Sequence, residues 1–309
     1  MPRSSPLHRP LTGHRPAPET QNLRGILFMC LAVSMFPFLN TSVKYLSADF
    51  PTPMIVWGRY LGHFLFMALA FLPGNGWRLF VTHHFGIQLL RSLLLLGSTA
   101  LYFTALGTID LAMAAAIGFA APFIVTSLSV PILGERVGWR RWSAVTIGFF
   151  GVLLVARPGT GAVPSAALLT LGSTLCYGTY QVLTRKLAAR DSPVTTILYT
   201  AIVGATITSL VVPFYWHPPR EPIHIALFLG MGLVGGFGHF FVIKAYQFGE
   251  ASLIAPFAYL QLLGSTVLGY WVFGDLPDRW TWIGAAVIIG CGIYIAYRET
   301  ALASAPAQR

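Results

Sequence analysis

The chain has 309 residues, of which 55% are hydrophobic and only 10% charged, and its mean hydropathy is +0.67. This composition excludes an ordinary soluble domain and predicts an integral membrane protein. The formal net charge of +10 indicates topology and not nucleic-acid binding, because a bilayer would hide most of the surface from nucleic acid.

The chain begins with a polar segment, and a series of apolar spans follows it. Residues 1–23 contain five prolines and no apolar run, so we expect a disordered cytoplasmic tail and not a signal peptide. Ten later windows approach the roughly 20 apolar residues that a helix needs to cross a bilayer. They are 24–45, 51–72, 87–108, 111–133, 139–157, 164–185, 194–214, 223–247, 250–273 and 280–298. Residues 299–309 are expected to form a C-terminal tail.

The basic residues predict the orientation of these spans. With ten spans both termini share a side, and that side collects fifteen Lys and Arg residues against four on the other side. Loops rich in Lys and Arg stay in the cytoplasm. Both termini are therefore expected to be cytoplasmic.

The chain also repeats itself. At an offset of 140 residues Gly134 aligns with Gly274, and at an offset of 142 Asp49 aligns with Asp191. The two halves, 24–157 and 164–298, hold five spans each. Because five is odd, the second half must enter the membrane from the opposite side, which predicts an all-α protein built as a 5+5 inverted repeat. Such a scaffold favours a transporter over a duplication that serves stability alone.

Two blocks of sequence carry a family resemblance. The stretches "APFIVTSLSVPILGE" (121–135) and "APFAYLQLLGSTVLGYWVFGD" (255–275) share a proline within the span and end in Gly followed by an acid. They resemble the two EamA domains of the drug/metabolite transporter superfamily. "KYLSADFPTPMIVWGRYLGHF" with "SLIAPFAYLQLL" resembles the branch that contains S-adenosylmethionine and riboflavin transporters. Asp275 departs from the Glu that is common in the family.

The resemblance implies a ten-helix basket with a central cavity, in which the fifth span of each half lies at the periphery. It also implies that the chain carries a small metabolite. In such a cavity the polar residues of the spans would face water or protein, since lipid cannot satisfy them.

Arg59 is the most unusual residue of the spans. Eight residues from Pro51 at 1.5 Å each place it about 12 Å deep, near the bilayer midplane. A cation there costs at least about 2.5–3.5 kcal/mol unless it faces a wet or paired site. Its counterpart in the second half is Ala201, so the scaffold does not require a cation here. Two roles stay open, namely contact with substrate and structural bonding within the cavity.

Other polar residues share faces with the cavity by helical spacing. The residues expected to line the cavity or bind substrate are Arg59, His63, Asn40, Tyr102, Tyr177, Gln181, His239 and Tyr259. For any single Tyr, helix–helix hydrogen bonding is the alternative. Pro37, Pro122 and Pro256 lie inside spans and should bend or open their helices, either as gating elements or as static kinks.

Cofactor and metal sites are not expected. Cys30, Cys176 and Cys291 fall in three separate spans without ligand spacing, so we interpret them as packing residues. A GxGxxG match at 230–235 lies inside an apolar span, where close helix packing explains it better than nucleotide binding. All ten carboxylates lie in tails, loops or span ends, so no midplane proton relay is evident.

The sequence therefore predicts a secondary transporter and not an enzyme. The expected substrate is a small organic metabolite, namely an amino acid, a nucleoside-like or a vitamin-like compound, carried across the cell membrane by alternating access as a monomer or homodimer. The alternatives are a channel, a non-transporting sensor and a membrane enzyme. A channel would need a filter-like element, and an enzyme a convergent acid–base set, and the sequence shows neither.

Overall fold

The computed structural model describes residues 18–134, 138–156, 165–187, 191–248, 257 and 260–303. Within these ranges the fold is all-helical, as predicted. The α-helices are α1 (Pro18–Leu46), α2 (Thr52–Asn75), α3 (Phe85–Leu106), α4 (Leu111–Gly118), α5 (Ala121–Leu133), α6 (Trp139–Ala156), α7 (Ser165–Leu187), α8 (Pro193–Val211), α9 (Pro222–Phe248), α11 (Leu260–Leu268) and α12 (Arg279–Ala303). Short turns η1 (Gly76–Phe80), η2 (Val212–Tyr215) and η4 (Gly269–Phe273) follow α2, α8 and α11.

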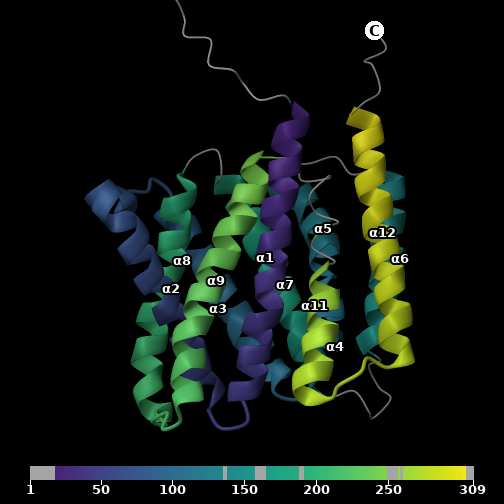
Figure 1. Ribbon diagram of the computed structural model, residues 1–309. Coiled ribbons are helices and arrows are strands. Elements are labelled where there is room, and N and C mark those ends of the chain that lie inside the picture. The colour runs from purple at the N-terminus through teal and green to yellow at the C-terminus, as the bar shows by residue number, and fades with distance from the viewer. Residues whose placement is uncertain are drawn as a thin grey trace, which may run out of the picture.

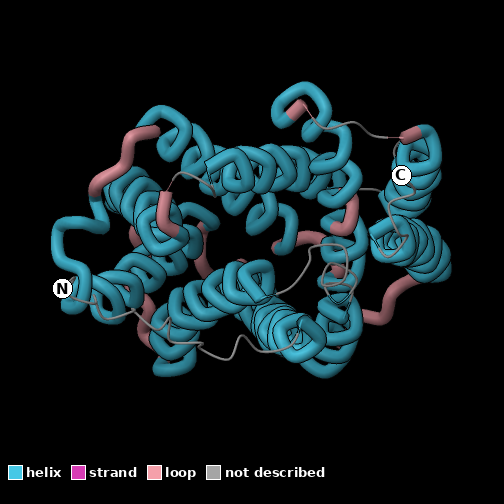
Figure 2. Tube along the Cα trace, turned by 90° about the horizontal axis from the view of Figure 1, so that it is seen from above, coloured by secondary structure: helices cyan, strands magenta, loops and turns pink. Residues whose placement is uncertain are grey.

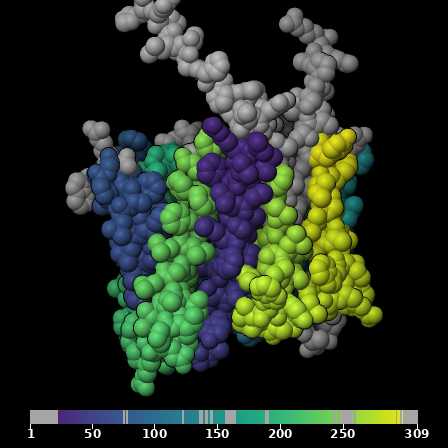
Figure 3. All heavy atoms as spheres, in the orientation of Figure 1, coloured from purple at the N-terminus to yellow at the C-terminus, as the bar shows by residue number. Residues whose placement is uncertain are grey.

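The outside of the bundle is apolar. In the described part of the chain, six helical segments are long and apolar enough to cross a membrane: Leu23–Leu46, Thr52–Gly74, Phe85–Leu106, Leu111–Leu133, Pro193–Tyr215 and Pro222–Val242. Leu27, Leu31 and Phe38 of α1 are exposed, and α1 lies beside α9 on the face seen in Figure 3. Exposed tryptophans such as Trp139 and Trp271 lie at or near helix ends, where membrane interfaces favour them. These features belong to a protein that lipid surrounds.

Helix α7 is not among those six segments, but several of its polar residues point inward. Thr170, Ser173 and Thr174 are buried, and Ser173 donates to the Ser98 carbonyl of α3 at 2.8 Å. A span that hides its polar side chains against another helix needs fewer apolar residues than one that faces lipid all round.

The predicted span 111–133 consists of two helices. α4 ends at Gly118, and α5 begins at Ala121 with Pro122 in its first turn. Proline has no backbone N–H to donate and is tolerated in a first turn, so a new helix starts there. The interruption follows the physical expectation for Pro122, whereas its gating role stays a prediction.

The helices pack in a bundle with one pair set apart (Figures 1 and 2). α1 contacts α9, α3 contacts α7, and α2 contacts both α8 and α9. α6 and α12 pack on each other at one edge of the bundle, and α4 contacts both of them. The buried core therefore lies among α1, α2, α3, α4, α7, α8 and α9, and seven of the eight residues of α4 are buried in it.

The first and the last helix of the chain extend beyond the predicted spans. α1 begins at Pro18 and not at residue 24, and α12 continues to Ala303 and not only to residue 298. Hydropathy marks the part of a helix that lies in lipid, and a helix can continue into water beyond it. The first turn of α1 and the last turn of α12 lie at the same end of the bundle (Figure 1).

Candidate functional site

Arg59 joins three helices inside the bundle. It lies on α2, only 5% of its surface is exposed, and Nη1 donates to Oγ1 of Thr99 on α3 at 2.7 Å. Nη2 lies 3.1 Å from Nε2 of His239 on α9. Because a guanidinium can only donate, Nε2 of His239 is the acceptor in this pair. The guanidinium also lies 5.0 Å from the ring centroid of Tyr60 and 5.7 Å from that of Phe103.

Two buried nitrogen atoms beside this cluster have no hydrogen-bond partner among the described residues. They are Nε of Arg59 and Nε2 of His63, one turn further along α2. His63 is 4% exposed, and its ring stacks on that of His239 with centroids 6.4 Å apart. A buried polar atom without a partner costs free energy, so these nitrogens mark a place where a further acceptor would be stabilised.

The charge of Arg59 has no opposite charge beside it in the described residues. The ion pairs there involve Lys44 and His224, and neither is part of this cluster. Thr99, His239, Tyr60 and Phe103 supply dipoles and ring faces only. A guanidinium with only neutral neighbours would gain more from a bound anion than one already paired.

Close packing of α2 on α9 fixes the cluster. A Cβ atom added at Gly232 would lie 2.4 Å from Cα of Gly62, so the two backbones touch. A Cβ atom added at Gly235 would lie 3.7 Å from Nε of Arg59, and one at Gly236 would lie 3.3 Å from Cδ2 of His63. Gly232, Gly235 and Gly236 thus serve helix packing, as the sequence indicates, whereas a Cβ atom at Gly230 would meet nothing within 4 Å.

The remaining predicted site residues lie in separate groups. Asn40 of α1 donates to the hydroxyl of Tyr102 on α3 at 3.4 Å, which is a long hydrogen bond. Tyr177 stacks on Tyr180 with centroids 5.7 Å apart, and Gln181 is half-buried on the same helix, α7. The contacts described above join Arg59, His63 and His239 but not these residues.

The three predicted prolines and Tyr259 are described to different extents. Pro37 lies inside a continuous α1, and its ring Cγ would be 2.7 Å from a Cβ atom at Gly264. The side chain of Pro122 is outside the described part, as are the whole of Pro256 and Tyr259.

A second buried arginine was not among the predicted site residues. Arg91 of α3 is 1% exposed, and it donates to Oγ1 of Thr184 at 3.0 Å, to Oε1 of Gln88 at 3.1 Å and to the carbonyl of Thr196 at 2.6 Å. Arg91 is one of the fifteen basic residues predicted to lie on the cytoplasmic side. Its position three residues after Gln88, inside the predicted span 87–108, was the available signal, because residues three apart share a helix face.

An ion pair joins the two halves of the chain at the end of the bundle opposite to Arg91. Nζ of Lys44, at the end of α1, contacts Oδ2 of Asp275 and also donates to the carbonyl of Ile109 at 3.1 Å. Burial and the nearby charge of Asp275 raise the pKa of Asp110, although Lys44 opposes this. The charge of Lys44 therefore acts on both carboxylates, while its ion pair is with Asp275.

We predict that Lys44 and Asp275 are energetically coupled. In a double-mutant cycle of Lys44→Met and Asp275→Asn, the double variant should be more stable than the sum of the single losses implies, by about 1 kcal/mol. Thermal unfolding of the purified protein in detergent measures this coupling. Strictly additive losses would contradict the pairing.

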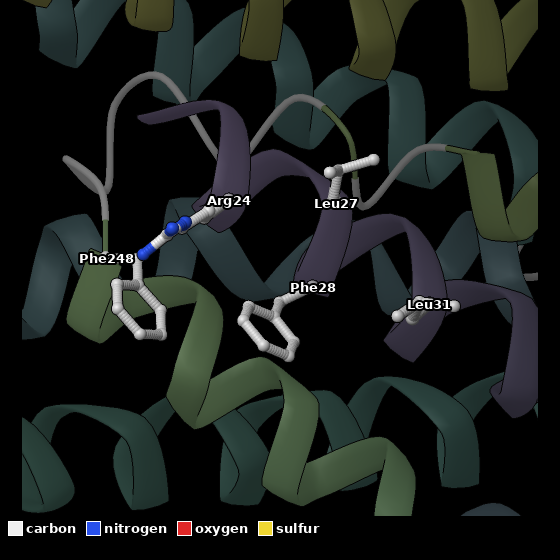
Figure 4. A pocket seen from close by; sticks show the side chains of 5 residues that line it. All are labelled: Arg24, Leu27, Phe28, Leu31 and Phe248. Atoms are coloured by element: carbon white, nitrogen blue, oxygen red, sulfur yellow. The ribbon is translucent and has the colours of Figure 1, made fainter. Parts of the chain in front are cut away.

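One surface groove is unsuitable as a substrate site. It lies between α1 and α9 and is lined by Arg24, Leu27, Phe28, Leu31 and Phe248 (Figure 4). Arg24 is the one charged residue of this lining, and Leu27 is 56% exposed. An open, apolar groove on the outside of the bundle faces lipid, so we place the candidate site at Arg59.

The apolar exterior and the buried cluster of Arg59, His63 and His239 inside it define a multi-pass membrane protein with a polar interior site. The chain matches the EamA-like transporter family over residues 23–157 and 164–298, and it belongs to that family.

Relatives of known name are transporters. Over 280 residues the chain is 28% identical to the S-adenosylmethionine uptake transporter of Rickettsia prowazekii, covering 90% of this chain and 94% of that protein. It is 28% identical over 282 residues to the riboflavin transporter of Vibrio cholerae, with coverage of 90% and 94%. It is 26% identical over 272 residues to the pseudopaline exporter CntI of Pseudomonas aeruginosa, with coverage of 86% and 93%.

A solved crystal structure shares the fold, with a TM-score of 0.63 and 16% identity over 93% of this chain and 99% of that one. Together with the family match, the named relatives make this chain a metabolite transporter of the inner membrane and not an enzyme. The predicted family, class and location are confirmed.

Proposed function

We propose that the protein is a secondary transporter that moves a small organic metabolite by alternating access, with Arg59 in contact with an anionic group of that metabolite. Its ten spans form two inverted five-helix units, 24–157 and 164–298, with both termini in the cytoplasm. The observation that carries the proposal is the buried guanidinium of Arg59, which within the described part of the chain has only neutral partners and an Nε without a hydrogen-bond partner.

The contacts between helices support the inverted repeat. If α1–α6 and α7–α12 are equivalent units, the contact of α1 with α9 corresponds to that of α7 with α3, and both exist. The contact of α2 with α9 likewise corresponds to that of α8 with α3. α2 meets α8, and α6 meets α12, as equivalent elements related by a two-fold axis would. Two such units can exchange roles, which alternating access requires.

Local backbone structure supports the same relationship. Gly134 ends α5 and Gly274 follows η4, and both have a φ of 73° in the left-handed region that favours glycine. These are the glycines that align at an offset of 140 residues. Equivalent positions in the two halves thus end their helices in the same way.

The substrate class follows from the chemistry around Arg59. A carboxylate or similar anion would accept from the unpartnered Nε of Arg59 and from His63. The rings of Tyr60, Phe103 and His239 offer apolar and stacking surfaces nearby. An amino acid, a nucleoside-like or a vitamin-like compound with an anionic group fits these demands. The oligomeric state, monomer or homodimer, stays a prediction.

A thermal-shift screen of the purified protein tests the substrate class. Amino acids, S-adenosylmethionine and riboflavin are added separately, and a compound that binds the folded state should raise the melting temperature further as the ratio of its concentration to its Kd increases. We expect a rise with at least one compound and none for the variant Arg59→Ala. Unchanged melting temperatures with all of them would contradict the substrate class.

A further inference from the structure

Two aspartates occupy equivalent positions in the two halves. Asp49 precedes Phe-Pro after α1, and Asp191 precedes Ser-Pro after α7. They align at an offset of 142 residues. Each stands at the turn that leads into the second helix of its half, α2 or α8. These two turns lie at opposite ends of the bundle (Figure 1).

Each aspartate contacts the start of a helix that belongs to the other half. Oδ2 of Asp49 lies 3.4 Å from Nε2 of His224 in the first turn of α9. Oδ2 of Asp191 accepts from Oγ1 of Thr82, just before α3, at 2.6 Å and from Nε2 of Gln88 in α3 at 2.8 Å. Since α3 and α9 are the third helices of their halves, the two contacts are the same contact made at opposite ends.

The two contacts differ in strength. The side chain of Asp49 is 58% exposed, and its bridge is an ion pair only when His224 is protonated. Asp191 instead bonds a fully buried Gln88, which itself accepts from Arg91. Burial alone would raise the pKa of Asp191. The hydrogen bonds from Thr82 and Gln88 and the nearby histidines outweigh this effect, so the pKa lies below its ordinary value. The carboxylate of Asp191 therefore stays charged near neutral pH, and its hydrogen bonds are charge-assisted.

We propose that Asp49 and Asp191 are the paired gate residues of the carrier, each fastening the two halves at one membrane face, with the Asp191 contact the stronger. This assignment rests on the proposed function, because a carrier that alternates must part the two halves at one face at a time. With the termini in the cytoplasm, Asp191 fastens the cytoplasmic face and Asp49 the outer face. Opening toward the cytoplasm then requires more free energy than opening toward the outside.

A side-specific labelling experiment tests the proposal without a known substrate. The reporter is Ser98→Cys, near the middle of α3, in the full chain with Cys30, Cys176 and Cys291 changed to Ala. A membrane-impermeant methanethiosulfonate is added to right-side-out or inside-out vesicles, and the rate of labelling is measured from each face.

Asp191→Asn should raise the labelling rate from the cytoplasmic face about tenfold, since the loss of charge-assisted hydrogen bonds costs at least about 1.4 kcal/mol. Asp49→Asn should raise the rate from the outer face only about threefold, because exposed pairs contribute less. Thr82→Val keeps the carboxylate and removes one donor, so it should act like Asp191→Asn but more weakly, even if Asp191→Asn folds poorly.

Neighbouring substitutions serve as controls. Ser192→Ala removes a hydrogen bond from the backbone N–H of Thr195 at the start of α8, and Ser47→Ala removes a hydrogen bond to the carbonyl of Lys44 at the end of α1. Neither should change the rate at either face. Rates that stay equal to the parent in Asp191→Asn, Thr82→Val and Asp49→Asn would overturn the gate assignment while leaving the transporter intact. A parent reporter that reacts from one face only would overturn alternating access itself.

Discussion

Arg59→Ala is expected to leave the protein folded and to reduce transport at least about thirtyfold, because removing one partner of a buried charge pair costs at least about 2 kcal/mol of binding. The melting temperature without substrate should fall less than in Arg91→Ala, because the loss of the hydrogen bonds to Thr99 and His239 is offset by removal of a buried charge that has no opposite charge beside it in the described residues. Uptake into proteoliposomes and thermal unfolding in detergent measure the two effects on one preparation.

Arg91→Ala is the matched control, because Arg91 is also a buried arginine but is tied to Thr184, Gln88 and the Thr196 carbonyl. Its loss leaves several buried groups without partners, each at about 1–3 kcal/mol, so this variant should lose stability. Arg59→Lys should keep stability and recover only part of the transport, since lysine lacks the planar fork of donors. If Arg59→Ala unfolds as readily as Arg91→Ala, Arg59 is a structural residue and the substrate assignment is wrong.

Gly232→Ala is expected to destabilise the protein by about 3 kcal/mol, at the upper end of overpacking costs, because the new methyl group meets the backbone of α2 and not a flexible side chain. The added Cβ atom would lie 2.4 Å from Cα of Gly62 and 2.7 Å from its carbonyl carbon. Separating α2 from α9 would also move Arg59 away from His239, so transport should fall together with stability.

Gly230→Ala is the control on the same helix. A Cβ atom at Gly230 meets nothing within 4 Å, and alanine has the higher helix propensity. This variant should be as stable as the parent or slightly more stable. Equal melting temperatures for the two alanine variants would show that the approach of α2 to α9 is not tight.

The all-helical membrane character and the family could be predicted from the sequence because both depend on local pattern. Apolar length marks a membrane helix wherever it packs, and the 140-residue offset that aligns Gly134 with Gly274 needs no structure to find. Arg59 stood out for the same reason, since a cation in an apolar run is costly whatever its neighbours are.

The partners of these residues could not be predicted, because they depend on which helices meet. Gln88 contacts Asp191 more than 100 residues away, and Lys44 contacts Asp275 from the other half. Helical spacing placed Tyr177 and Gln181 on one face of α7, but it could not tell whether that face meets Arg59 or other residues. The role of Arg91 could not be predicted for the same reason, because its partners come from three helices.

The most direct test of the account is transport of labelled S-adenosylmethionine or riboflavin, together with the compounds that raise the melting temperature, into proteoliposomes of the purified protein. Uptake should saturate with concentration, accelerate when unlabelled substrate is present on the opposite side, and be lost in Arg59→Ala. Flux that rises linearly with concentration and ignores substrate on the opposite side would contradict a carrier that alternates around a single site.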